Sequence, residues 1–262
     1  MTAPTAPLRV ERRDGVALLT LALPDRRNAM TAELTAAWVA AVEAIRADRD
    51  VRAVVVTGEG TAFCAGGDLS WIGESPDLDV MALRDRMLPF YRAWLSVRTL
   101  DVPVIAAVNG AAVGAGLCLA LGCDIRYAAP GATFSAPFAK LGMHPGMAAT
   151  YLLPEVVGVA RARELLLTGR RVGAEEANAI GLVSGVADDV VAHALDTARG
   201  IADSAPIAVR LTKTALAYAG HHSIDAALDW EGLAQPVTMA SADLREGLAA
   251  QAERRAPRFT GA

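Results

Sequence analysis

The N-terminal part of the chain alternates between apolar runs and one amphipathic stretch. Residues 8–12 and 16–21 are apolar or alternate in polarity on either side of Asp14-Gly15, which predicts a β-hairpin. Thr31 is a candidate N-cap for a helix that extends to about residue 47. The apolar face of this helix repeats at helical spacing and consists of Leu34, Trp38, Val42 and Ile45. Residues 51–57 are a continuous apolar run, which is typical of a buried strand.

The middle of the chain continues the alternation of strands and helices. Residues 103–108 and 125–128 predict two more buried strands, with an apolar helix between them over residues 114–122. Residues 62–68 are predicted to be a loop. Residues 78–100 predict a helix that Pro89 kinks or breaks. The order strand, helix, strand, helix indicates an α/β layered core.

The last third of the chain is mostly helical in pattern. Ser223 and Ser241 are candidate N-caps for two of its helices, and residues 183–186 predict one short strand. Helices are predicted over residues 148–153, 160–167, 174–180, 188–204, 206–219, 224–240 and 242–254.

Composition narrows the class of protein. Hydrophobic residues make up 53% of the 262-residue chain and charged residues 21%, so a packed core is expected instead of disorder. The net charge of -4 and the absence of a basic run argue against nucleic-acid binding. Mean hydropathy is +0.31, yet no stretch of about 18 apolar residues predicts a membrane span, and no signal-peptide pattern opens the chain. Three cysteines without metal-like spacing indicate reduced thiols in a cytoplasmic protein.

Two glycine-rich turns, at residues 65–68 and 114–116, are the most informative segments for function. Glycine permits positive φ and close approach to the backbone, and a helix start presents unpaired N–H groups. Two such turns brought together supply two donors to one oxygen, which is an oxyanion hole. The alternative is a pair of tight turns that bind nothing. The G-x-G at 114–116 lacks the third glycine of a dinucleotide fingerprint, and no G-x-S-x-G hydrolase motif occurs.

Several segments together resemble the enoyl-CoA hydratase/isomerase family, also called the crotonase superfamily. They are LPDRRNAM at 23–30, AFCAGGDL at 62–69, PVIAAVNG at 103–110, ALGCD at 120–124 and DLREGL at 243–248. The match follows nearly the whole chain in order. It implies an α/β fold in which residues 1–200 form a spiral of ββα units. Residues 201–262 are then a helical C-terminal region used in trimerisation.

The resemblance also implies a ligand, partners and residue roles. The family acts on acyl-CoA thioesters, so coenzyme A is expected as part of the substrate, with no other cofactor. A homotrimer or hexamer is expected. The resemblance assigns the two oxyanion N–H groups to Gly67 and Ala115. Residues implied near the coenzyme A moiety are Arg26, Arg27, Ala29, Ala65, Gly66, Asp68 and Lys213.

The chain departs from the family's hydratases at their acidic residues. Those enzymes use two glutamates that position one water and exchange its proton with the substrate. The corresponding residues here are Cys118 and Phe138, and the position of a later acid in other relatives is Gly146. The sequence therefore predicts isomerisation or another enolate reaction in preference to hydration. A non-catalytic acyl-CoA-binding homologue is the alternative, and an unrelated activity such as peptide hydrolysis ranks last.

The remaining candidates lie around the expected substrate pocket, which is predicted to be lined by Trp71, Cys118, Phe138 and Lys140. His144 is a candidate proton carrier, or a loop histidine satisfied by backbone or water. Lys140 is a candidate base if desolvated and otherwise a surface lysine. Cys118 is a candidate nucleophile at a helix start, or a small buried residue. Asp68 is expected to cap the helix that follows it.

Overall fold

The predicted hairpin begins a five-stranded sheet. In the computed structural model, which describes residues 6–68, 70, 73, 78–217 and 223–262, β1 (Leu8–Arg13) and β2 (Val16–Leu21) pair antiparallel. β3 (Ala53–Gly58), β5 (Val104–Val108) and β7 (Ile125–Ala128) add in parallel, giving the order β1-β2-β3-β5-β7. The hairpin and the three central strands are confirmed at nearly their predicted bounds.

A second sheet has no counterpart in the predicted elements. It contains four strands, β4 (Ala62–Cys64), β6 (Ala111–Val113), β8 (Thr133–Ser135) and β9 (Arg171–Gly173), in the order β4-β6-β8-β9. After the hairpin, the pairs β3/β4, β5/β6 and β7/β8 each give one strand to each sheet, which is the expected spiral of ββα units. The prediction that residues 62–68 are entirely loop was wrong, because a three-residue strand is too short to show a two-residue alternation.

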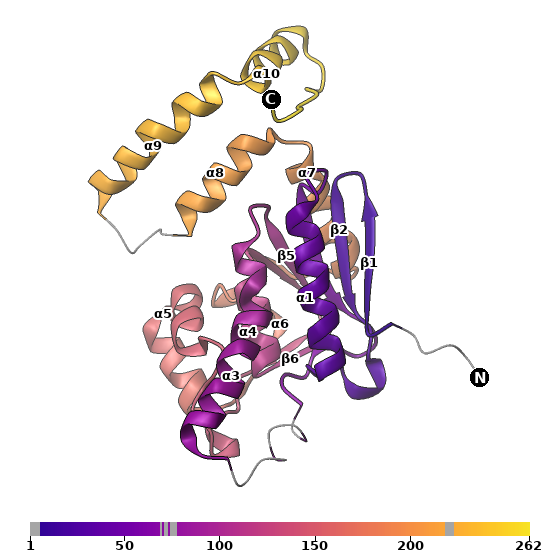
Figure 1. The fold of residues 1–262 in the computed structure, drawn as a ribbon, viewed down its shortest axis with the longest axis vertical. Helices are drawn as coiled ribbons and strands as arrows, with labels where there is room; N and C mark the ends of the chain where they lie inside the picture. The colour runs from indigo at the N-terminus through magenta and orange to yellow at the C-terminus, as the bar shows by residue number, and fades with distance from the viewer. Residues whose placement is uncertain (1–5, 69, 71–72, 74–77, 218–222) are drawn as a thin grey trace, which may run out of the picture.

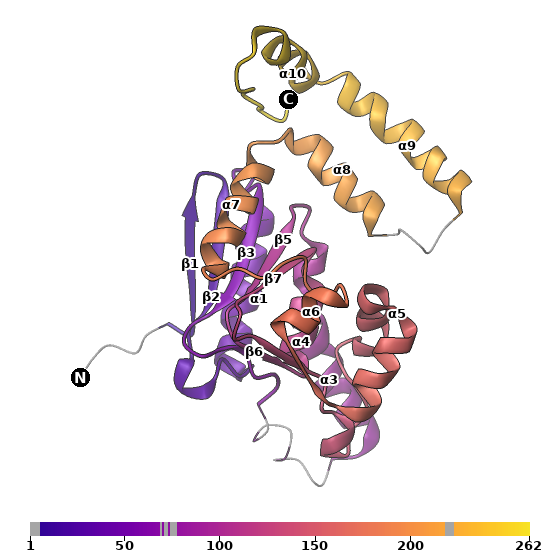
Figure 2. The same ribbon diagram turned by 180° about the vertical axis from the view of Figure 1, so that it is seen from behind.

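Helices cover both faces of the five-stranded sheet (Figures 1 and 2). α1 (Ala32–Ala47), α3 (Val80–Leu95) and α4 (Ala115–Gly122) lie on one side, and α7 (Val190–Ala202) lies on the other. Val54 and Val56 of β3 point into the larger core, whereas Val55 packs in the cluster that contains α7. Burial of both faces explains why β3 is apolar throughout instead of alternating.

The helices agree with the sequence patterns except in a few details. The Thr31 hydroxyl accepts a hydrogen bond from the Leu34 amide, so Thr31 caps α1 as predicted. Pro89 lies inside α3 without ending it, and η2 (Ser96–Thr99) follows that helix. Packing of α3 against α1 and α4 outweighs the one hydrogen bond that a proline removes.

Beyond β8, the helices of the core resume. α5 (Ala149–Thr168) joins two predicted helices, with Gly158 at φ 77° where they meet. α6 (Ala174–Ala179) follows, and η1 (Pro24–Arg26) and η3 (Ala139–Leu141) are short 3₁₀ turns earlier in the chain. The strand predicted at 183–186 was wrong, because among the described residues only a bridge between Ala128 and Val186 forms there.

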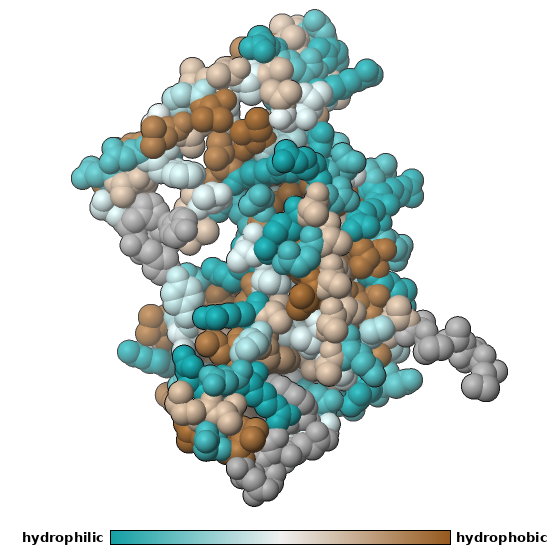
Figure 3. All heavy atoms as spheres, in the orientation of Figure 1, coloured by the Kyte–Doolittle hydropathy of each residue, from teal (hydrophilic) through white to brown (hydrophobic). Residues whose placement is uncertain are grey.

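The C-terminal helices extend away from the two sheets (Figure 1). They are α8 (Pro206–Leu216), α9 (Ile224–Met239) and α10 (Ala242–Glu253), and Ser223 and Ser241 cap the last two as predicted. The predicted boundary after residue 200 falls within the last turn of α7, which still packs on the sheet. Apolar side chains gather on α9 where it faces α8 (Figure 3). No helix in the described part of the chain is both long and apolar enough to span a bilayer.

Candidate active site

The first glycine turn follows the end of β4 and is tightly enclosed. Gly66 is buried and has φ 96°, a backbone conformation that favours glycine. A Cβ atom at this position would lie 2.6 Å from the Val113 carbonyl oxygen and 3.3 Å from the Ala115 amide nitrogen. Because Val113 and Ala115 belong to the second turn, the fold brings the two glycine turns into direct contact.

The second turn connects β6 to α4 and packs closely against the first. Gly114 has φ 54° and its amide donates to the Ser135 carbonyl of the neighbouring strand at 2.9 Å. A Cβ atom at Gly116 would lie 2.1 Å from the Cys64 carbonyl oxygen, so only glycine allows α4 to approach the end of β4. The start of α4 is therefore held against the residue that precedes the first turn.

Two backbone amides at this junction are available for a ligand. Ala115 is the first residue of α4, and an amide at that position has no acceptor within the helix. Gly67 lies in the first turn, in a parallel bridge with Met30. Within the described part of the chain, neither the Gly67 nor the Ala115 amide donates a hydrogen bond. The geometry therefore provides unused donors in two touching turns.

The segment that contains Arg26 and Arg27 is attached to the first turn. The Met30 amide donates to the Gly66 carbonyl at 2.8 Å, and the Ala65 amide donates to the Arg27 carbonyl at 2.9 Å. The Arg26 guanidinium pairs with the Asp68 carboxylate at 2.9 Å, and its own side chain is 53% exposed. The predicted coenzyme A residues of the two segments, including Ala29 between Arg27 and Met30, thus lie together on one side of the site.

Asp68 has a local role in addition to this ion pair. Its carboxylate accepts hydrogen bonds from the Ser70 amide at 3.1 Å and from the Ser70 hydroxyl at 2.7 Å. This is how a capping aspartate binds the chain that follows it. The helix that it was predicted to cap lies largely outside the described residues, as does Trp71 of the predicted pocket.

Asn28 organises this region, although sequence reasoning quoted it only as part of a motif. Its side chain is fully buried, its φ is 55°, and its side-chain oxygen Oδ1 accepts a hydrogen bond from the Leu23 amide at 2.9 Å. Its side-chain nitrogen donates to the carbonyls of Ala62 at 2.8 Å and Glu59 at 3.0 Å. Asn28 therefore ties the turn at residues 23–28 to the start of β4. The signal was a polar residue that tolerates positive φ between Arg27 and Ala29.

Cys118 and Phe138 lie beside the second turn, at the positions where the resemblance puts the hydratase glutamates. Cys118 is one helical turn beyond Ala115, is 1% exposed, and its thiol is 3.6 Å from the Gly146 carbonyl oxygen. Burial raises the pKa of Cys118 to about 12, so the thiol is neutral near pH 7 and does not supply a nucleophile. The Phe138 ring lies 3.7 Å from the position of a Cβ atom on Gly114. Neither side chain therefore supplies a charged acid or base beside these turns.

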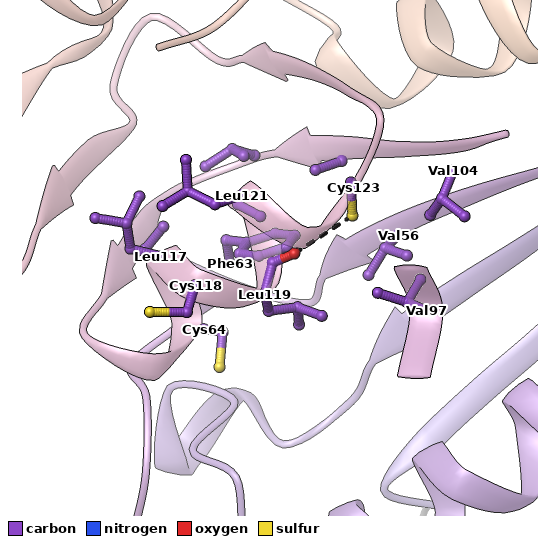
Figure 4. Packing of buried hydrophobic residues seen from close by; sticks show 14 of the residues in the cluster. Val56, Phe63, Cys64, Val97, Val104, Leu117, Cys118, Leu119, Leu121 and Cys123 are labelled. Carbon is purple, nitrogen blue, oxygen red and sulfur yellow. Dashed lines mark hydrogen bonds between the residues drawn. The ribbon is translucent and has the colours of Figure 1, made fainter. Parts of the chain in front are cut away.

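Figure 4 shows the three cysteines around α4. Cys118 on α4 and Cys123 directly after α4 point to opposite sides, and the Cys123 thiol donates to the Leu119 carbonyl at 3.5 Å. Cys64 lies below Cys118, at the end of β4. The pKa values of Cys64 and Cys123 are also raised to about 12, mainly by burial. All three cysteines therefore behave as small apolar residues.

The three remaining candidates lie away from this junction or are already engaged. His144 is exposed, and its Nδ1 forms a hydrogen bond with the Pro145 carbonyl at 2.8 Å. This arrangement corresponds to the second of the two sequence-based options, a loop histidine bonded to backbone. Lys140 is exposed with its stem against Gly169, so it is not the desolvated base considered from the sequence. Lys213 pairs with Asp124 and donates to the Val102 carbonyl, both at 2.8 Å. That lysine ties α8 to the core within one chain.

A side chain that sequence reasoning missed lies next to Cys118. Tyr91 comes from α3, is half-buried, and packs against the larger core. A Cβ atom on Gly146 would lie only 2.5 Å from the Tyr91 hydroxyl oxygen. Nothing in the local pattern around Tyr91 indicates a site, because its neighbours are 27 and 55 residues further along the chain.

A spiral of paired strands that holds two glycine turns together defines an α/β protein whose candidate site is built mainly from backbone. Comparison with known proteins identifies the family. Residues 11–262 match the family model for enoyl-CoA hydratase/isomerase. A Mycobacterium tuberculosis protein named as a probable enoyl-CoA hydratase, EchA14, is 50% identical over 200 residues, covering 76% of this chain and 77% of its own. The 1,2-epoxyphenylacetyl-CoA isomerase of Escherichia coli K12 is 39% identical, covering 94% of this chain and 95% of its own.

Solved structures give the same result. The crystal structure of an enoyl-CoA hydratase from Bacillus anthracis superposes with a TM-score of 0.92 at 33% identity, covering 98% of this chain and 100% of its own. An enoyl-CoA hydratase from Polaromonas sp. JS666 gives a TM-score of 0.91 at 32% identity, covering 97% of this chain and 99% of its own. The chain belongs to the enoyl-CoA hydratase/isomerase family, the crotonase superfamily, whose members act on acyl-CoA thioesters.

Proposed function

We propose that this chain binds an acyl-CoA thioester and stabilises its enolate with the backbone amides of Gly67 and Ala115. The observation that carries the proposal is the contact between the two turns, where a Cβ atom on Gly66 would lie 3.3 Å from the Ala115 nitrogen. Both amides lack acceptors among the described residues. Preorganised amides aimed at a developing oxyanion stabilise it without rearrangement during the reaction.

The proposed chemistry is isomerisation or another enolate reaction, not hydration. Positioning a water for addition needs carboxylates at hydrogen-bond range. At the two relevant places the chain offers a thiol whose pKa is about 12 and an aromatic ring, at Cys118 and Phe138. The likeness to an epoxyphenylacetyl-CoA isomerase along 94% of the chain supports the isomerase class.

The coenzyme A moiety is proposed to lie over the side of the site formed by the first turn and the segment before Met30. The exposed Arg26 guanidinium, held by Asp68, is suited to a phosphate group. Ala65, Gly66 and the backbone near Arg27 are joined by hydrogen bonds in the same place. Lys213 is bonded within its own chain, so its predicted contact with coenzyme A needs a separate test.

A non-catalytic acyl-CoA-binding protein is the second candidate. It is favoured by one observation, the exposed position of His144 with its Nδ1 already bonded to the Pro145 carbonyl. This candidate predicts tight binding of acyl-CoA without turnover. Assays of purified protein with a panel of enoyl-, dienoyl- and malonyl-type CoA thioesters separate the two candidates.

The amide donors can be removed one at a time by proline substitution. Ala115→Pro deletes the N–H at the first position of α4, where proline is tolerated. The expected result is a loss of about 10²–10³ in kcat, the effect of removing one oxyanion donor. Ala32→Pro, at the first position of α1 and exposed, is the matched control and should retain full activity. Equal activity of the two variants, with both folded by circular dichroism, would rule out the amide proposal.

The exposed apolar residues of the C-terminal helices support assembly into a homotrimer or hexamer. Leu216 is 66% exposed, Ile224 is 76% exposed and Leu233 is 73% exposed, and no described residue of α8 or α9 is buried. Large exposed apolar side chains grouped in one place are characteristic of an interface. Contact with further copies of the chain would remove them from water.

A further inference from the structure

Tyr91 brings a hydroxyl group to an otherwise apolar part of the site. The residue lies on α3, and the T-shaped contact of its ring with Phe90 has centroids 6.1 Å apart. Cys118 and Met147, which belong to the same region, are each 1% exposed. The phenol is therefore a polar group that α3 contributes near Cys118 of α4.

Gly146 is the reason that the hydroxyl fits where it does. A Cβ atom at Gly146 would lie 2.5 Å from the Tyr91 oxygen and 2.9 Å from the ring carbon that carries it. Real Cβ atoms do not make contacts this short, so the phenol occupies the space of a side chain at position 146. An acidic side chain at that position and Tyr91 in its present position are mutually exclusive.

The hydroxyl itself is unused. No residue in the described part of the chain forms a hydrogen bond with it, and the Tyr91 side chain is only partly exposed. Burial, followed by the nearby Cys118 thiol, raises the pKa of Tyr91 above its ordinary value. The group is therefore a neutral hydrogen-bond donor at physiological pH and not a phenolate base.

The Tyr91 hydroxyl is close to the helix face that begins at the Ala115 amide. Cys118 lies one helical turn beyond Ala115 on α4, and residues three apart on a helix share a face. Its thiol contacts the Gly146 carbonyl, whose residue adjoins the phenol. The hydroxyl therefore lies near Cys118, one helical turn along α4 from the Ala115 amide.

We propose that Tyr91 is a specificity-determining residue whose hydroxyl donates a hydrogen bond to an oxygen atom on the acyl chain. The preferred substrates are then acyl-CoA thioesters that carry a hydroxyl, carbonyl or epoxide oxygen near the thioester, in preference to plain hydrocarbon chains. This inference rests on the proposed function, because it takes a thioester to occupy the two turns with its acyl chain directed along α4 toward Cys118. A polar group that must be desolvated on binding discriminates against ligands that leave it unpaired.

The test compares ligands that differ by one oxygen. Dissociation constants of butyryl-CoA, 3-hydroxybutyryl-CoA and acetoacetyl-CoA are measured by calorimetry for the wild type and Tyr91→Phe. Loss of one neutral hydrogen bond should raise the dissociation constants of the two oxygenated ligands by roughly fivefold to tenfold. The dissociation constant of butyryl-CoA should change by no more than about twofold. Tyr151→Phe, on α5 and 47% exposed, is the matched control and should change none of the three.

A second variant tests the position of the hydroxyl without removing it. Gly146→Ala places a methyl group where the phenol now lies and should reduce the preference for oxygenated ligands in the same direction. If Tyr91→Phe weakens the binding of all three ligands equally, or of none, the inference is wrong, although the proposed thioester site is unaffected. Failure of the wild type to bind any acyl-CoA would instead overturn the proposed function, and this inference with it.

Discussion

Gly66→Ala is the substitution that most directly examines how the two turns are joined. The new methyl carbon would lie 2.6 Å from the Val113 carbonyl oxygen, and φ at this residue is 96°. An alanine held at a positive φ costs about 1–2 kcal/mol, and overpacking a filled site costs about 1–3 kcal/mol. We expect a loss of about 2–5 kcal/mol of folding free energy, which lowers Tm by roughly 5–15 °C in a chain of this length.

The same substitution should also reduce ligand binding, because the methyl group pushes the first turn away from the Ala115 amide. Thermal unfolding by circular dichroism and acyl-CoA binding by calorimetry measure the two effects. Gly200→Ala is the control: a Cβ atom there meets nothing within 4 Å, and the residue lies inside α7. The control should be stabilised by about 0.5–1 kcal/mol with unchanged binding. A Gly66→Ala protein as stable and as tightly binding as this control would refute the close contact.

Three further predictions concern other parts of the molecule. Asn28→Ala removes three hydrogen bonds from a buried position, and we expect about 2–4 kcal/mol of destabilisation in urea unfolding; a loss under 1 kcal/mol would contradict its organising role. Replacing both Leu228 and Leu233 with Asp should lower the mass measured by light scattering from that of the proposed trimer or hexamer to that of a monomer; an unchanged trimer or hexamer mass would place the interface elsewhere. The three cysteines should resist iodoacetamide at pH 8 until urea is added, because pKa values of about 12 keep them neutral; rapid native labelling would show that a thiol is accessible.

The features that could be read from the sequence are those with a local cause. β3 is a continuous apolar run because both faces of its sheet are covered, and α1 begins at Thr31 because a hydroxyl there satisfies an unpaired amide. The segments with family resemblance also identified the family correctly. The C-terminal helices were predicted within a few residues, since their serine caps act on the next turn of the same helix.

The features that only tertiary structure decided depend on residues distant in sequence. β4, β6, β8 and β9 have three residues each, so no periodicity marks them, and pairing between strands from different units creates the second sheet. Contact of Gly66 with the Ala115 turn depends on that pairing. Tyr91 reaches the site only because α3 packs beside α4 and Gly146 leaves room for its hydroxyl. Hydrophobic patterns encode which face of an element is buried, whereas packing decides which distant groups meet there.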